Sequence, residues 1–152
     1  MPELTGHMLH FAYGVDLPRA EFARSCPGAE WFGPARLEGH RLVFDSSGRP
    51  NVRADAAGTV WGALWLVPAA RLPELDAGAG AGYERTTRRI VSPAGPRTEA
   101  TLYLSADPGE GVPSPALLEA LLAGAKESRL PAAYVQELKA AGTGGKLRKD
   151  SR

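Results

Sequence analysis

The feature that most constrains the fold of this chain is the apolar run GTVWGALWLV at residues 58–67. β-Branched and aromatic residues favour strands, and an apolar run without alternation is typical of a strand buried on both faces. A second apolar run, residues 8–13, stops at Gly14 and indicates another buried strand. With 152 residues, the chain is long enough to bury such strands in the core of one domain.

Three further strands are predicted from the hydrophobic pattern and the turn residues. Residues 31–44 have a strand pattern that a Gly-Pro pair interrupts. Residues 83–91 and 97–105 form a pair of strands around a turn rich in Pro and Gly. Residues 45–57, which contain Gly, Pro, Ser and Asn, are predicted to be a polar loop.

Helical patterns begin at four places, which are Asp16, Pro68, Ser114 and Pro131. Asp16 is expected to cap the first helix and Ser114 the third, because short polar side chains accept hydrogen bonds from the free N–H groups of a first helical turn. The Ala- and Gly-rich residues 77–82 are expected to be too flexible to continue the second helix. A chain of mostly strands that ends in two helices indicates an α+β fold.

Charge and cysteine content exclude several classes of protein. The 18 Lys and Arg residues nearly balance the 17 Asp and Glu residues, which argues against a nucleic-acid-binding protein with its basic face. No apolar run is long enough to span a membrane, and no signal peptide is visible. The one cysteine, Cys26, cannot form an internal disulfide, so a reducing cytoplasm is the expected compartment.

We expect residues 1–141 to form a single domain and the Gly- and Lys/Arg-rich residues 142–152 to be a disordered basic tail.

The segment YGVDL at residues 13–17 lies where the first predicted strand gives way to the first predicted helix. Gly14 can adopt backbone angles that other residues avoid, and a tight loop of this kind can turn successive N–H groups toward an anion or a carbonyl oxygen. The alternative is a plain connection between strand and helix, and the local sequence leaves both interpretations open.

Other motifs do not support a metal, phosphate or thiol site. The Gly-rich residues 142–146 lack the first glycine and the final Ser or Thr of a phosphate-binding loop. His7, His10 and His40 have no metal-ligand spacing, so we expect no metal site. Cys26 is expected to be a buried, inactive thiol.

Four segments resemble, in order and spacing, the motifs of the gamma-glutamylcyclotransferase family. They are YGVDL at 13–17, similar to the family's YGSNL; VWGALW at 60–65, similar to VWGxxW; LDAGAG at 75–80 with Tyr83, similar to LDxxEG followed by Tyr; and Ser114-Pro115, GAKE at 124–127 and LPAAY at 130–134, similar to SP, GAKE and LPxxY. Each motif is short, but their order and spacing over about residues 10–141 indicate the fold of this family.

The resemblance implies a small, mixed, β-barrel-like sheet with flanking helices. It also implies an enzyme that releases a gamma-glutamyl or similar acyl group from a small-molecule amine or amide as 5-oxoproline, by attack of the substrate's own α-amino nitrogen. In the family, the loop after the first strand holds the glutamyl oxygens, the glutamate of LDxxEG moves the proton, and no metal or organic cofactor takes part. Family members serve glutathione turnover or unmask natural products, and the sequence does not separate these roles. A monomer or homodimer without nucleic-acid or membrane partners is expected.

Two departures from the family pattern bear on catalysis. Ala79 stands at the position of the acid/base glutamate, and its methyl group cannot move a proton. Val15 and Asp16 replace the Ser-Asn of the loop, so a hydroxyl and an amide are lost and a carboxylate is gained. By the resemblance, the candidate substrate-binding residues are Tyr13, Gly14, Val15, Asp16, Leu17, Tyr83 and Tyr134. Each of the three tyrosines can also be an ordinary core residue.

Three explanations of Ala79 remain open. The chain can be a variant engineered from Glu to Ala at this position, which binds substrate and turns it over poorly. It can be a natural homologue in which Asp16 supplies the missing carboxylate. It can also be a non-catalytic protein that binds a glutamyl-like ligand.

Overall fold

The two apolar runs pair with each other inside the fold. The computed structural model describes residues 6–142. Strand β1 (His7–Ala12) is antiparallel to β3 (Pro50–Pro68), with His7 opposite Pro68 and Ala12 opposite Ala63. Residues 62–65 of β3 are buried without a break, so both faces of this strand are covered, as predicted.

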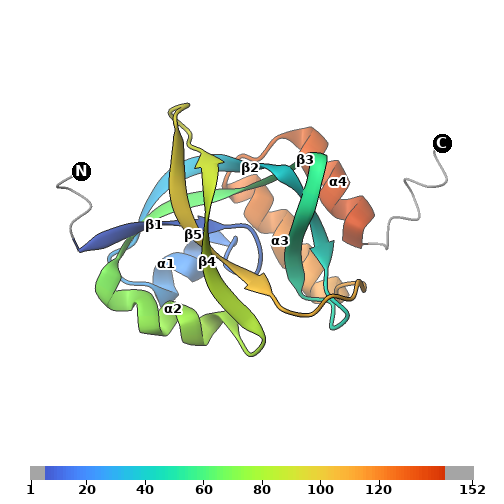
Figure 1. Ribbon diagram of the computed structural model, residues 1–152, viewed down its shortest axis with the longest axis horizontal. Coiled ribbons are helices and arrows are strands. Elements are labelled where there is room, and N and C mark those ends of the chain that lie inside the picture. The colour runs from blue at the N-terminus through green and yellow to red at the C-terminus, as the bar shows by residue number, and fades with distance from the viewer. Residues whose placement is uncertain (1–5, 143–152) are drawn as a thin grey trace.

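Five strands close into a barrel among the described residues (Figure 1). Strand β2 (Glu30–Phe44) pairs with β3, and β4 (Tyr83–Val91) pairs with β2 and with β5 (Arg97–Ser105). Strand β5 is parallel to β1 and meets it where His10 lies opposite Thr101. This arrangement confirms the predicted α+β fold with a mixed, barrel-like sheet.

Helices flank the barrel in two groups, α1 with α2 and α3 with α4 (Figure 1). They are α1 (Arg19–Ser25), the 3₁₀-helix η2 (Ala69–Arg71), α2 (Leu72–Ala79), α3 (Pro115–Glu127) and α4 (Ala132–Gly142). The predicted cap of α3 is confirmed, because the Ser114 side chain accepts a hydrogen bond of 3.1 Å from the Leu117 N–H. Apart from Gly142, the predicted tail lies outside the described residues.

The predicted polar loop at residues 45–57 is wrong. Strand β3 already begins at Pro50, and β2 and β3 stay paired up to Phe44 and Pro50, so only a short turn separates them. Residues 53–59 of β3 are half-exposed or exposed, and Arg53, Asp55 and Gly58 among them give this stretch the composition of a loop. Its strand conformation comes from cross-strand hydrogen bonds, which no local pattern reveals.

Two predictions about helix ends are also wrong. Asp16 does not cap α1: the N-cap is Pro18, without a side-chain cap, and the Arg19 N–H donates to Glu127 Oε1 of α3 at 2.8 Å. Helix α2 continues through Ala79 and ends at Gly80, whose φ of 95° is unfavourable for other residues. The side chain at position 79 is therefore placed by a helix rather than by a flexible loop.

The turn between β2 and β3 depends on the buried carboxylate of Asp45. It accepts hydrogen bonds from Ser105 Oγ at 2.7 Å and from the N–H groups of Ser47 and Arg49 at 2.9 Å each. Burial opposes its ionisation, but these hydrogen bonds outweigh burial and lower the pKa of the Asp45 carboxyl. The turn thereby fixes the start of β3, where Pro50 borders the pocket described below.

Asp45→Asn is expected to lower the free energy of unfolding by about 2 kcal/mol at neutral pH, because an amide oxygen accepts these hydrogen bonds less strongly. A lowered folded-state pKa contributes stability above the unfolded value of about 3.9, and this stability is lost as the pH falls through the folded value. The difference in free energy of unfolding between Asp45→Asn and the unmodified chain should therefore shrink in acid. Urea unfolding at neutral and acidic pH measures it, with the half-exposed Asp55→Asn as control. An equal difference in free energy of unfolding at both pH values would contradict this role of the Asp45 carboxylate.

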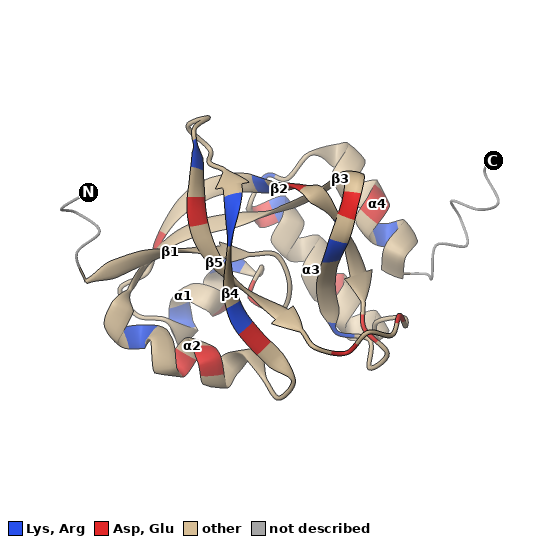
Figure 2. Ribbon diagram, in the orientation of Figure 1, with Lys and Arg blue, Asp and Glu red and all other residues tan. Residues whose placement is uncertain are grey.

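Acidic and basic residues are interspersed along the described chain, with both signs on β4, on β5 and around α2 (Figure 2). Among the described residues, no helix is both long and apolar enough to cross a membrane. Cys26 is buried, as predicted, and burial raises the pKa of its thiol.

Candidate functional site

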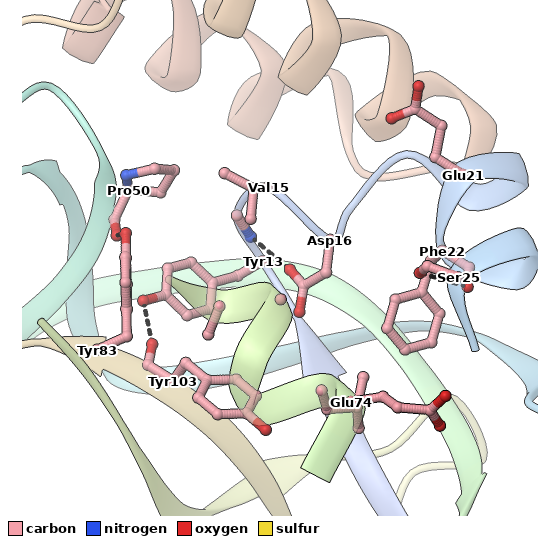
Figure 3. A pocket seen from close by; sticks show the side chains of 14 residues that line it. Tyr13, Val15, Asp16, Glu21, Phe22, Ser25, Pro50, Glu74, Tyr83 and Tyr103 are labelled. Carbon is pink, nitrogen blue, oxygen red and sulfur yellow. Dashed lines mark hydrogen bonds between the residues drawn. The ribbon is translucent and has the colours of Figure 1, made fainter. Parts of the chain in front are cut away.

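A pocket of about 270 Å³ opens between the loop after β1, the helices α1 and α2, and one end of the β4–β5 pair (Figure 3). In this view Asp16 lies between the side chains of Tyr13 and Tyr83 and those of Phe22 and Ser25 (Figure 3). The predicted site residues that line it are Tyr13, Gly14, Val15, Asp16, Ala79 and Tyr83. The fold therefore brings two separate family-like segments, YGVDL and LDAGAG, to one cavity.

The loop after β1 is held by close packing on both sides. A Cβ atom at Gly14 would lie 3.0 Å from Pro50 Cβ, and one at Gly124 of α3 would lie 2.9 Å from the Pro18 nitrogen. Both distances are shorter than ordinary contacts, so glycine at each position lets another element approach the loop. The loop is thus clamped between the start of β3 and α3.

The N–H groups of this loop are partly used within it. Leu17 N–H donates to the Gly14 carbonyl at 2.8 Å, and Gly14 N–H donates to Asp16 Oδ1 at 3.2 Å. The N–H groups of Val15 and Asp16 have no hydrogen-bond partner among the described residues. Two donors therefore remain for a ligand oxygen, beside a carboxylate that the family pattern does not contain there.

Asp16 is paired with a histidine that lies behind the pocket wall. His10 Nε2 is 2.6 Å from Asp16 Oδ2, and His10 is fully buried while the Asp16 side chain keeps 25% of its exposure. A contact this short between an imidazole and a carboxylate carries a proton between them. The Asp16 carboxylate is therefore anchored on its inner side and open to the pocket on its outer side.

Helix α2 is fixed to the barrel through Asp76. Its carboxylate accepts a hydrogen bond of 2.6 Å from the Tyr103 hydroxyl, and Arg85 Nη1 lies 3.1 Å from both of its oxygens. Ala79 is one turn further along the same helix and lines the pocket. The Asp of LDAGAG thus anchors the helix that carries position 79.

The pocket tyrosines line the pocket, and their hydroxyls donate hydrogen bonds to protein groups. Tyr13 Oη donates to the Tyr103 carbonyl at 2.6 Å, and Tyr83 Oη donates to the Pro50 carbonyl. Burial, with smaller contributions from neighbouring groups, raises the pKa values of Tyr13, Tyr83 and Tyr103 well above the ordinary range. Their hydroxyls stay protonated at neutral pH, so none of them is suited to accept a proton from a substrate.

Two predicted site residues lie elsewhere. Leu17 is buried in the core beneath the loop. Tyr134 is buried next to a second hollow, between α4 and the β2–β3 hairpin, and its hydroxyl has no hydrogen-bond partner among the described residues. The pocket thus contains tyrosines from the loop after β1, from β4 and from β5, but not the one from α4.

Sequence reasoning missed His10, Tyr103 and Pro50 at this site. The spacing of the histidines tests His10 only as a metal ligand, although a lone histidine in an apolar strand indicates a buried polar partner. Tyr103 and Pro50 carry no local signal, because their contacts come from elements far along the chain. Among residues 6–142, no three His, Cys, Asp or Glu side chains come together in a way that could hold a metal ion.

Comparisons with known proteins agree on one family. The sequence profile of the AIG2-like family matches residues 59–138. Human gamma-glutamylcyclotransferase is 28% identical in an alignment 145 residues long, which covers 87% of this chain and 77% of that protein. A solved structure of a gamma-glutamyl cyclotransferase superposes with a TM-score of 0.81 at 29% identity, over 88% of this chain and 87% of that one. YkqA from Bacillus subtilis, at 20% identity, shares the fold with a TM-score of 0.80, over 93% of this chain and 56% of that one.

Proposed function

Since the chain belongs to the AIG2-like family, we propose that it is a gamma-glutamylcyclotransferase-type enzyme in which Asp16 is the acid/base. Its substrate is a small-molecule gamma-glutamyl amine or amide, and its products are 5-oxoproline and the free amine. The relatives named gamma-glutamylcyclotransferase support the reaction type. Three acidic residues line the pocket together with Ala79, namely Asp16, Glu21 and Glu74. The observation that carries the role of Asp16 is that, of these three, it alone lies on the loop after β1, beside the free N–H groups of that loop.

The reaction needs one group that both accepts and donates a proton. Asp16 takes a proton from the substrate's α-ammonium, which becomes a neutral amine, and this nitrogen attacks the γ-carbonyl carbon. Asp16 then returns the proton to the leaving nitrogen as its bond to that carbon breaks. The remaining extra proton on the ring nitrogen leaves with the product amine, which departs as an ammonium ion. Asp16 ends in its starting state, so no other reactant is required.

The loop and the tyrosines supply the rest of the site in this proposal. The free N–H groups of Val15 and Asp16 would face the negative oxygen that forms at the γ-carbonyl carbon, where donors stabilise the transition state most. The Asp16 carboxylate attracts the substrate's ammonium group before the reaction. The aromatic rings of Tyr13 and Tyr83 would cover the glutamyl chain and exclude water.

A second candidate function follows from the methyl group of Ala79, which lines the pocket where the family pattern has a carboxylate. If Asp16 does not move protons, the chain binds a glutamyl-like ligand and turns it over poorly. This covers an engineered variant and a natural binding protein alike.

The experiment that separates the two is the release of 5-oxoproline from a panel of gamma-glutamyl compounds. The panel contains gamma-glutamyl dipeptides, gamma-glutamyl polyamines and the gamma-glutamyl amide of lysine. Binding of each compound is measured by calorimetry alongside turnover. Release above the rate without protein supports the enzyme, binding without release supports the binding protein, and neither binding nor release would contradict both.

A further inference from the structure

His10 is a buried polar residue that the proposed reaction does not yet use. It lies on β1 at the point where β1 meets β5, fully buried inside the barrel wall. Its ring stacks on Phe22 of α1, with centroids 5.4 Å apart and planes within 7°, and tilts against Tyr103 at 5.8 Å. These contacts fix the plane of the imidazole, so its Nε2 atom points at one place.

That place is the Asp16 carboxylate, 2.6 Å away. The other ring nitrogen, Nδ1, is 3.5 Å from Thr101 Oγ1, whose hydroxyl already donates to the Leu9 carbonyl. The contact of Nδ1 with Thr101 is long, so the short contact of Nε2 with Asp16 is the stronger of the two. The packed ring therefore presents Nε2 to the Asp16 carboxylate at a fixed place.

Asp16 does not cap helix α1, although its place in the sequence suggests that role. A carboxylate shortly before a helix ordinarily caps it, but Glu127 of α3 accepts the hydrogen bond from Arg19 N–H at the start of α1. Asp16 Oδ1 instead accepts from Gly14 N–H, and Oδ2 pairs with His10. Because Glu127 bonds to the start of α1, Asp16 is not needed as a helix cap. Its carboxylate instead pairs with His10 at the wall of the pocket.

We propose that His10 is the positioning residue of the site: its Nε2–H holds the Asp16 carboxylate in the orientation from which it exchanges protons with the substrate. The inference rests on the proposed role of Asp16. It adds a residue that touches no substrate and acts through one hydrogen bond. Its loss should reduce kcat much more than it changes KM, because the substrate's own contacts remain.

Two substitutions of His10, each of which keeps a different property of its side chain, test the proposal. His10→Gln keeps an N–H donor at a similar reach but loses the ring, whereas His10→Phe keeps the stacking on Phe22 but loses the donor. We expect His10→Phe to lower kcat by about tenfold or more and His10→Gln to retain more of it. The half-exposed His40→Gln, which changes a histidine outside the pocket, is the control and should match the unmodified chain.

A purely structural role predicts the reverse order. If His10 only fills the core, His10→Phe should retain more activity than His10→Gln, and activity should follow the melting temperature. That order would overturn the proposal. Melting temperatures of all variants are measured in parallel, so that a loss of folding is separated from a loss of positioning.

A readout without turnover separates this inference from the proposed function. In the ¹⁵N-histidine-labelled protein, NMR should detect a His10 Nε2 proton protected from exchange with water. Asp16→Asn should shift or remove this signal, while His40→Gln should leave it unchanged. If the unmodified chain releases no 5-oxoproline but the signal depends on Asp16, the proposed function fails and the pairing stands. A His10 signal that ignores Asp16→Asn would overturn the pairing itself.

Discussion

Asp16→Asn is expected to slow 5-oxoproline release by about 10²–10⁴-fold, the usual contribution of a general acid/base. Asparagine has nearly the same shape and can still accept the hydrogen bond from Gly14 N–H, which Asp16 Oδ1 accepts at 3.2 Å. It cannot take up a proton from the substrate's ammonium or return one to the leaving nitrogen. The loss should therefore lower kcat, and KM should rise as well, because the charge that attracts the substrate's ammonium group is also removed. Initial rates over a range of substrate concentrations measure kcat and KM separately.

The control for this prediction is Asp55→Asn, which makes the same chemical change outside the pocket. Its rate should stay near that of the unmodified chain. Thermal melting of Asp16→Asn should show a loss of about 1–2 kcal/mol at most, from the two hydrogen bonds of the carboxylate, with Gly14 N–H and with His10. An Asp16→Asn protein that keeps full turnover would remove Asp16 from the reaction.

Ala79→Glu is expected to restore turnover to the Asp16→Asn protein by about 10²–10⁴-fold. Helix α2 continues through position 79, and its side chain lines the pocket that Asp16 also lines. A carboxylate placed there should take over the proton transfers, because the family pattern has its acid/base at this position. The double variant is compared with Asp16→Asn alone on the same substrate.

The matched control replaces Ala79 by Gln in the same Asp16→Asn background. Glutamine fills nearly the same volume but moves no proton, so this protein should remain slow. Equal rates from the Glu and Gln versions would show that position 79 affects packing rather than proton transfer. A glutamate version without activity that still binds ligand would favour the binding-protein alternative.

Local patterns predicted much of the fold, and the family resemblance that they carried is confirmed. Strands β4 and β5 have the predicted bounds, because alternation and a Pro- and Gly-rich turn are encoded within a short stretch. The Ser114 cap was likewise predictable from a few neighbouring residues. The loop YGVDL and the segment LDAGAG were predicted to share a site, and both line one pocket.

What sequence reasoning missed depends on contacts between distant residues. Asp16 looked like a helix cap, but a carboxylate more than a hundred positions away, that of Glu127, bonds to the start of α1 instead. His10 became interpretable only when the loop placed Asp16 against it. The hairpin at residues 45–57 looked like a loop because its hydrogen bonds come from the opposite strand. The position of Tyr134 depends on how α4 packs, which its own helical pattern does not specify.

In the proposed reaction, the substrate's own α-amino nitrogen, and not water, attacks the γ-carbonyl in this pocket. The most direct measurement is mass spectrometry of the acyl product after turnover in ¹⁸O-enriched water, with a gamma-glutamyl amine labelled with ¹⁵N at the α-amino nitrogen. Cyclisation moves that nitrogen into the ring and adds no oxygen, whereas hydrolysis adds one oxygen from water. We expect 5-oxoproline that contains ¹⁵N and no ¹⁸O. Glutamate that carries ¹⁸O, or a bound substrate that yields no product, would contradict it.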